Sequence, residues 1–155
     1  VNANPSSLSN QYHIKPHIRY TEIFLIYAEV ANEACGPDGK GANAFSARDV
    51  IAAIRKRAGI TQPDAYLASI SDKESMRALI KNERRLELCF EDTRFWDLRR
   101  WKDDLTVPAK GVRIEGTTYN YFTVENRSYD NSYMIYGPIP DVVVTRFNLI
   151  QNKGW

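Results

Sequence analysis

The chain has 155 residues, of which 43% are hydrophobic and 26% are charged, the composition of an ordinary globular domain or of a piece of a larger one. Its 21 basic and 19 acidic residues leave a net charge of +2, whereas a dedicated nucleic-acid-binding protein usually carries a large basic excess. No run of about eighteen apolar residues is present, so no transmembrane helix is expected. The chain starts at Val1 without a signal segment, and we expect a mature product or, in preference, a fragment of a longer polypeptide.

Residues 1–18 are polar and contain two prolines, which predicts an irregular lead-in to a domain at 19–155. Within this lead-in, His13 and His17 have the i, i+4 spacing of paired metal ligands. Pro16 lies between them and disfavours the helix that would align their side chains. A metal pair is therefore the less favoured interpretation.

Cys35 and Cys89 are the two cysteines of the chain. Neither belongs to a cysteine–histidine cluster with zinc-ligand spacing, so no metal site and no cofactor are predicted. Both cysteines fall in helical patterns, and we expect them to be free and buried.

The spacing of apolar residues predicts three helices. Steps of three and four residues predict a helix over about 20–35 and a second helix over about 44–58, followed by Gly59. The two form an antiparallel helix hairpin that resembles a tetratricopeptide-type unit, although no second repeat is visible. The third and longest helix is predicted over about 72–102.

The third predicted helix opens at Ser71, with Glu74 completing a capping box. Glu83 and Glu87 fall on or beside its apolar stripe, where a carboxylate needs a partner. Arginines are frequent in the same stretch, so we expect a partly buried network of glutamates and arginines. Paired catalytic carboxylates are the functional alternative, but no nucleophile or metal ligand lies nearby in the sequence.

The stretch RFWDLRRW at 94–101 combines aromatic and basic residues. If it is helical, Trp96 and Arg100 are spaced for a cation–π pair, and Arg94 can reach Asp97. Phe95 and Leu98 would share an inward face. These pairings favour a packing and ion-pair role over a ligand-binding surface.

Loops and strands are predicted over 103–155, with one hairpin in the tyrosine-rich part and an extended or turn-like closing stretch. This region contains the local candidates for ligand contact, although strand-packing or loop-filling roles are favoured for all of them. The candidates are Tyr119, Asn120, Tyr121, Asn126, Tyr129 and Tyr133.

Four stretches resemble, in the same order, the C-terminal portion of the SusD/RagB family of outer-membrane glycan-binding lipoproteins. They are RYTEIFLIYAEVANEACG, VIAAIRKRAGI, IKNERRLELCFEDTRFWDLRRW and YGPIPDVVVTRFNLIQNKGW. The resemblance spans about 18–155 but covers only the tail of the family's longer polypeptide. Asp92 stands where the family commonly has glycine, which allows a helix to run on there or to be capped by Asp92 or Thr93, and Lys153 replaces a common proline.

The resemblance implies a mainly α fold, with a tetratricopeptide-like hairpin and a long helix followed by an irregular, strand-containing segment. It also implies a non-enzymatic surface protein that captures oligosaccharides for a SusC-like TonB-dependent transporter. The outer-membrane lipid anchor and most ligand-binding residues would lie in the missing N-terminal region, so no ligand residue is assigned here.

Two rival functions remain. A helical-repeat scaffold would bind a peptide or the transporter and would be indifferent to glycans. A glycoside hydrolase would use Glu83 with Glu87 or Glu91 as acid and base, but a general acid needs a raised pKa, and neighbouring arginines favour the ionised form.

Overall fold

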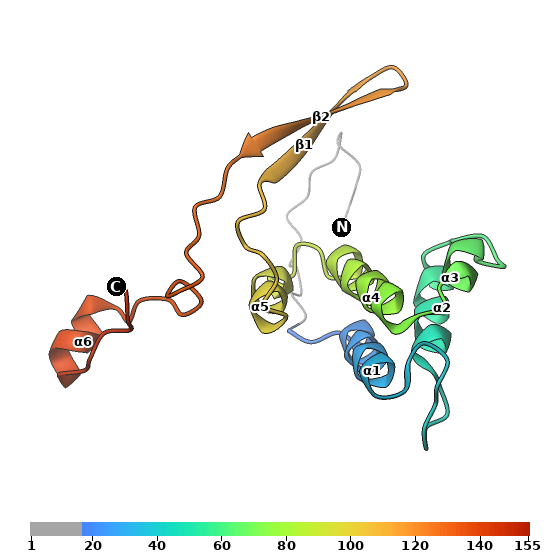
Figure 1. Ribbon diagram of the computed structural model, residues 1–155, viewed down its shortest axis with the longest axis horizontal. Helices are drawn as coiled ribbons and strands as arrows, with labels where there is room; N and C mark the ends of the chain where they lie inside the picture. The colour runs from blue at the N-terminus through green and yellow to red at the C-terminus, as the bar shows by residue number, and fades with distance from the viewer. Residues whose placement is uncertain (1–16) are drawn as a thin grey trace, which may run out of the picture. The chain divides into compact units, whose positions relative to one another are not determined.

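The computed structural model describes residues 17–155, which divide between Glu91 and Asp92 into two compact units. His13 lies outside the described residues, so the less favoured interpretation of His13 and His17 as a metal pair is not tested. The chain is mainly helical, with one small antiparallel sheet, as predicted (Figure 1). The elements in order are α1 Tyr20–Cys35, α2 Ala47–Arg57, α3 Ala65–Ser69, α4 Lys73–Glu87, α5 Thr93–Arg100, β1 Ala109–Glu115, β2 Thr118–Glu125 and α6 Asp141–Phe147.

The first unit is built from α1, α2 and α4, which lie side by side (Figure 1). Their facing sides bury one hydrophobic core, and each large aliphatic side chain in it contributes about 1.5–3 kcal/mol of burial. The fully or almost fully buried members are Leu25, Ala28, Ala47, Ile51, Met76, Leu79, Ile80 and Leu88. The core therefore holds the predicted helix hairpin against the first part of the third predicted helix.

Local capping explains where the helices begin. Ser46 accepts from the backbone N–H of Asp49 at 3.1 Å while the Asp49 carboxylate accepts from the Ser46 N–H at 3.0 Å, so α2 starts with a capping box. The predicted box at Ser71 is wrong. Asp72 caps α4 instead, accepting from the N–H of Ser75 at 2.8 Å, because its carboxylate suits the positive end of the helix dipole.

The predicted helix over 72–102 is wrong in its length, since α4 ends at Glu87 and α5 begins at Thr93. Between them, Phe90 and Asp92 have φ values of 64° and 62°, which no right-handed helix accommodates. Asp92 is among the residue types that tolerate this conformation best after glycine, and its side chain makes no capping hydrogen bond to α5.

Arg19 provides a hydrogen-bond donor for the C-terminal end of α4. Its guanidinium donates to the backbone carbonyl of Glu87, one of the acceptors that a helix C-terminus leaves without an intrahelical partner, and to the Glu91 carboxylate at 2.8 Å. The prediction that both cysteines are buried is wrong. Cys89 lies in the turn and Cys35 at the last position of α1, and both are exposed rather than buried.

In the second unit, β1 and β2 form an antiparallel hairpin joined at Gly116, which has φ 62°. The closing stretch contains a helix, α6, that the prediction of extended or turn-like structure missed. The acidic Asp141 in its first turn and the left-handed Asn148 at its end favour this helix. The Gln151 side chain then pairs with both the N–H and the carbonyl of Ile139, at 2.8 Å each.

Candidate functional site

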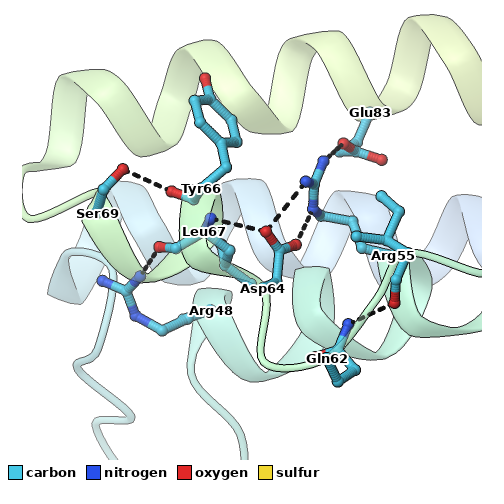
Figure 2. Close-up of polar contacts among 9 residues, drawn as sticks. Arg48, Arg55, Gln62, Asp64, Tyr66, Leu67, Ser69 and Glu83 are labelled. Carbon is cyan, nitrogen blue, oxygen red and sulfur yellow. Dashed lines mark hydrogen bonds and ion pairs between the residues drawn. The ribbon is translucent and has the colours of Figure 1, made fainter.

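The buried carboxylate Glu83 is part of an ion network that connects α2, α3 and α4. The Arg55 guanidinium on α2 donates to Glu83 Oε1 at 2.7 Å and to Asp64 Oδ2 at 2.5 Å (Figure 2). Asp64 also accepts from the backbone N–H of Leu67 at 3.0 Å and so caps α3. Glu83 and Asp64 are both buried, so each carboxylate is compensated by the same cation.

Hydrogen bonding sets the protonation of this network. The Arg55 guanidinium, followed by the N–H of Leu67, lowers the pKa of Asp64, because both donors favour the ionised carboxylate. In turn, the hydrogen bond to Asp64 and then that to Glu83 raise the pKa of Arg55 against the opposing effect of its burial. Asp64 and Arg55 therefore each favour the charged form that the other one pairs with.

A second arginine ties α3 to α2. Arg48 donates to the backbone carbonyls of Leu67 (Figure 2) and Ile70, the latter at 2.6 Å. The same guanidinium forms an ion pair with Asp38 at 2.6 Å. Since α3 has only five residues, these bonds, together with the capping by Asp64, hold it in place.

The other candidate carboxylates also have arginine partners. Glu87 Oε2 lies 2.5 Å from Arg57 Nη2, and Glu91 accepts from Arg19. Each of the three carboxylates therefore forms an ion pair with a different arginine. Glu83 faces the core, whereas Glu87 and Glu91 are half-buried. The arrangement supports the predicted glutamate–arginine network, with partners on α2 and before α1 rather than among the arginines of the same stretch.

Arg55, Asp64 and Arg48 were not predicted as members of the network. Asp64 follows Pro63 and precedes the apolar residues of α3, which is a helix-start signal that could have been recognised. The partners of the two arginines could not be predicted, because those contacts join segments distant in the sequence.

The candidate tyrosines of β2 lie on an exposed hairpin face. Tyr119 pairs with Ile114 and Tyr121 with Val112 across the strands, and the two tyrosines are 60% and 77% exposed. Asn120 pairs with Arg113 and points to the opposite face, because side chains alternate along a strand. The structure therefore groups two tyrosines and separates the asparagine from them.

The remaining candidates lie outside the hairpin. Asn126 and Tyr129 are in the loop after β2. Tyr133 packs edge-on against Trp155, with ring centroids 5.3 Å apart, and the indole N–H of Trp155 donates to the carbonyl of Tyr136 at 2.9 Å. Tyr133 thus has a packing role at the C-terminus.

The expected pairings within RFWDLRRW are wrong in detail. Arg100 lies over the ring of Trp101 at 5.0 Å and pairs with the buried Asp97 at 3.1 Å. Trp96 is 68% exposed and packs edge-on against Phe95, which is also exposed.

Residues 17–155 contain neither a membrane-spanning helix nor a cluster of metal-ligating side chains. None of the helices is long and apolar enough to cross a bilayer. Within the same residues, no group of three or more histidine, cysteine, aspartate or glutamate side chains could hold a metal ion.

The four motifs and the helical architecture agree with a comparison against protein families. The model of the SusD family matches residues 1–155, the whole chain. The chain belongs to the SusD family.

Two members of the family share about one third of their aligned residues with this chain. The chain is 33% identical over 122 residues to SusD-like protein P25 of Formosa agariphila, which covers 79% of this chain and 20% of that protein. SusD-like protein P2 of the same organism is 32% identical over 88 residues, covering 55% of this chain and 16% of that protein. The chain therefore spans about a fifth of the length of these curated relatives.

A solved relative has the same fold. The crystal structure of a SusD-like protein from Bacteroides fragilis superposes with a TM-score of 0.66 and 31% identity, covering 90% of this chain and 25% of that protein. The fold predicted from the resemblance is thereby confirmed.

Proposed function

We propose that this chain is the C-terminal part of a non-enzymatic glycan-binding protein at the surface of the outer membrane. It would capture oligosaccharides for import by a SusC-like TonB-dependent transporter. The single observation that supports this proposal most strongly is the match of the SusD family model to all 155 residues.

Proteins bind oligosaccharides through two kinds of contact. Sugar rings stack their apolar faces on aromatic side chains, while polar side chains and backbone groups take the hydroxyls. We assign the principal glycan contacts to the part of the polypeptide outside these 155 residues. Tyr119 and Tyr121 are two exposed aromatic residues on one face of the hairpin, and we assign them to the support of the hairpin.

The geometry of the carboxylates supports binding rather than hydrolysis. A glycosidase needs a protonated carboxyl group as its general acid and a second carboxylate facing the same sugar. Glu83 and Glu87 instead form ion pairs with two different arginines, Arg55 and Arg57. We therefore assign both to the stability of the helical unit.

The same proposal implies a membrane anchor and a transporter as binding partner for the complete polypeptide. The lipid anchor would be carried by the N-terminal region of the complete polypeptide, and the transporter would be the second binding partner besides the oligosaccharide. No nucleic acid is expected as a ligand, since the charges nearly balance.

Equilibrium titration of the complete polypeptide with a panel of oligosaccharides tests the proposal. We expect saturable binding of at least one oligosaccharide, and a loss of less than about tenfold in affinity for the Tyr119→Ala/Tyr121→Ala variant. Asn120→Ala, on the opposite face of the same strand, is the matched control. A larger loss confined to the tyrosine variant would move the glycan site to the hairpin, whereas binding of peptides without any glycan would favour the scaffold.

A further inference from the structure

A hollow of about 350 Å³ lies on one face of the β1–β2 hairpin. It is lined by Arg113 and Glu115 of β1 and by Asn120 and Phe122 of β2. Arg113 pairs with Asn120 across the strands, and because side chains alternate along each strand, all four lining residues share one face. This face is opposite the one that carries the two exposed tyrosines of β2.

The ring of Phe122 is held against the neighbouring strand. Its cross-strand partner is Gly111, and a Cβ added at that glycine would lie 2.9 Å from Phe122 Cζ and 3.2 Å from Phe122 Cε1. The ring therefore occupies the space that a side chain at position 111 would need, so an aromatic residue covers a glycine across the strands. Phe122 is still 48% exposed, and it presents a positioned aromatic surface to the hollow.

The polar side chains beside this ring are available for hydrogen bonding. Arg113, Glu115 and Asn120 are exposed, and within residues 17–155 the structure records neither a hydrogen bond nor an ion pair for their side chains. A guanidinium only donates hydrogen bonds, a carboxylate only accepts them, and an amide does both. The hollow thus combines donors and acceptors, and the charges of Arg113 and Glu115 cancel.

These groups match the chemistry of an uncharged sugar ring. A pyranose has an apolar face of C–H groups, which packs on an aromatic ring, and a rim of hydroxyl groups, which donate and accept hydrogen bonds. Phe122 provides the aromatic surface, while Arg113 and Glu115 provide a donor and an acceptor on the same face. An anionic sugar suits the hollow less well, because its charge would be repelled by the Glu115 carboxylate.

We propose that this hollow is a secondary glycan contact, which binds one uncharged sugar unit of an oligosaccharide captured by the complete polypeptide. The inference rests on the proposed function and adds a site to it, since the principal contacts are assigned outside these 155 residues. Because the hollow is open, the contact is weak alone and strengthens the binding of a chain that is already held elsewhere. Asn120 adds one hydrogen bond, and its loss from a secondary contact costs less than about tenfold in affinity.

Fluorine NMR of the complete polypeptide tests the contact at the hairpin directly. 4-Fluorophenylalanine replaces Phe122 in one sample and Tyr121, on the opposite face of the same strand, in the matched control. Each sample is titrated with hexasaccharides of glucose, mannose and xylose and with an oligogalacturonate, and calorimetry of the same samples measures total binding. Arg113→Ala in the protein labelled at position 122 shows whether the hairpin side chains make the contact.

We expect at least one uncharged hexasaccharide to shift the fluorine resonance at position 122 saturably and to leave that at position 121 unchanged. Arg113→Ala should raise the midpoint of the shift about tenfold, because a charged donor to the sugar is lost.

Calorimetric saturation without a shift at position 122, equal shifts at both positions, or a shift that Arg113→Ala leaves unaltered would overturn this inference and leave the proposed function standing. A shift produced by the oligogalacturonate alone would also overturn it, because the contact would then select a charged sugar. Absence of saturable binding of any oligosaccharide in calorimetry would overturn the proposed function together with this inference.

Discussion

Arg55 Nη1 lies 2.7 Å from Glu83 Oε1, although the two residues are 28 positions apart in the sequence. The contact joins α2 to α4 and places a carboxylate in the core with its charge compensated. Arg55 also holds Asp64, the cap of α3, so one guanidinium connects three helices. Removing Arg55 would leave both buried carboxylates with one partner fewer, and removing either carboxylate would take one partner from Arg55.

Glu83→Gln is expected to lower the free energy of unfolding by about 1–3 kcal/mol, since a charged hydrogen bond is weakened while Arg55 keeps Asp64. Glu87→Gln is the matched control on the same helix. Its partner Arg57 is largely exposed, and such pairs contribute about 0–1 kcal/mol. Urea denaturation monitored by circular dichroism measures both, and equal losses would contradict the assigned difference in burial.

Asp64→Ala is expected to be the most destabilising carboxylate substitution, at about 3–5 kcal/mol, because it removes one partner of a buried ion pair together with a helix cap. Asp72→Ala removes a cap alone and is expected to cost about 1 kcal/mol. Denaturation of the two variants side by side gives the comparison. A loss at Asp64 no greater than that at Asp72 would show that the Arg55 contact adds nothing to the cap.

Acid is expected to destabilise the first unit in a defined range. Hydrogen bonds from Arg77 and Lys73 lower the pKa of Glu33 to about 2, and those from Arg55 and the Leu67 N–H lower the pKa of Asp64. A lowered folded-state pKa gives stability that is complete above the unfolded-state values near 4 and is lost as the pH falls through the folded-state values. Unfolding midpoints between pH 6 and about pH 2.5 measure the effect. Asp64→Asn should flatten the curve, and an unchanged acid dependence in that variant would refute the assignment.

Gly154→Ala is expected to disrupt the C-terminal packing. Gly154 has φ +91°, and a Cβ placed there would lie 2.6 Å from the Cβ of Tyr133, so both the backbone and the Tyr133–Trp155 contact would have to change. Gly137→Ala is the control, because a Cβ there meets no atom within 4 Å. Near-ultraviolet circular dichroism, which reports the packing of aromatic side chains, should change in the first variant only. An identical spectrum for both would contradict the predicted clash.

Short-range patterns predicted much of the first unit. The apolar periodicity of α1 and α2 is strong, and a glycine follows the end of each helical stretch, so both helices were expected close to their observed positions. Glu83 was recognised as a paired carboxylate because a charge on an apolar stripe requires compensation. These inferences needed only local spacing and a general cost of burial.

The misplaced features depend on backbone geometry or on distant contacts. The break between α4 and α5 rests on left-handed residues at Phe90 and Asp92 and on the contact of Arg19 with the α4 carboxyl end, neither of which is visible in the periodicity. Once the helix is broken there, Trp96 lies on a short exposed helix, and the expected stack with Arg100 is replaced by one between Arg100 and Trp101. Backbone conformation and long-range contacts, rather than local periodicity, therefore determine the helix break and the surroundings of Trp96.

We propose that the complete polypeptide binds oligosaccharide without cleaving it. The most direct measurement is chromatographic analysis of an oligosaccharide that saturates the protein in titration, after prolonged incubation with the wild type and with Glu83→Gln. The account predicts that the oligosaccharide is recovered intact from both samples. Cleavage products that appear with the wild type and disappear with a Glu83→Gln variant of unchanged stability would contradict it.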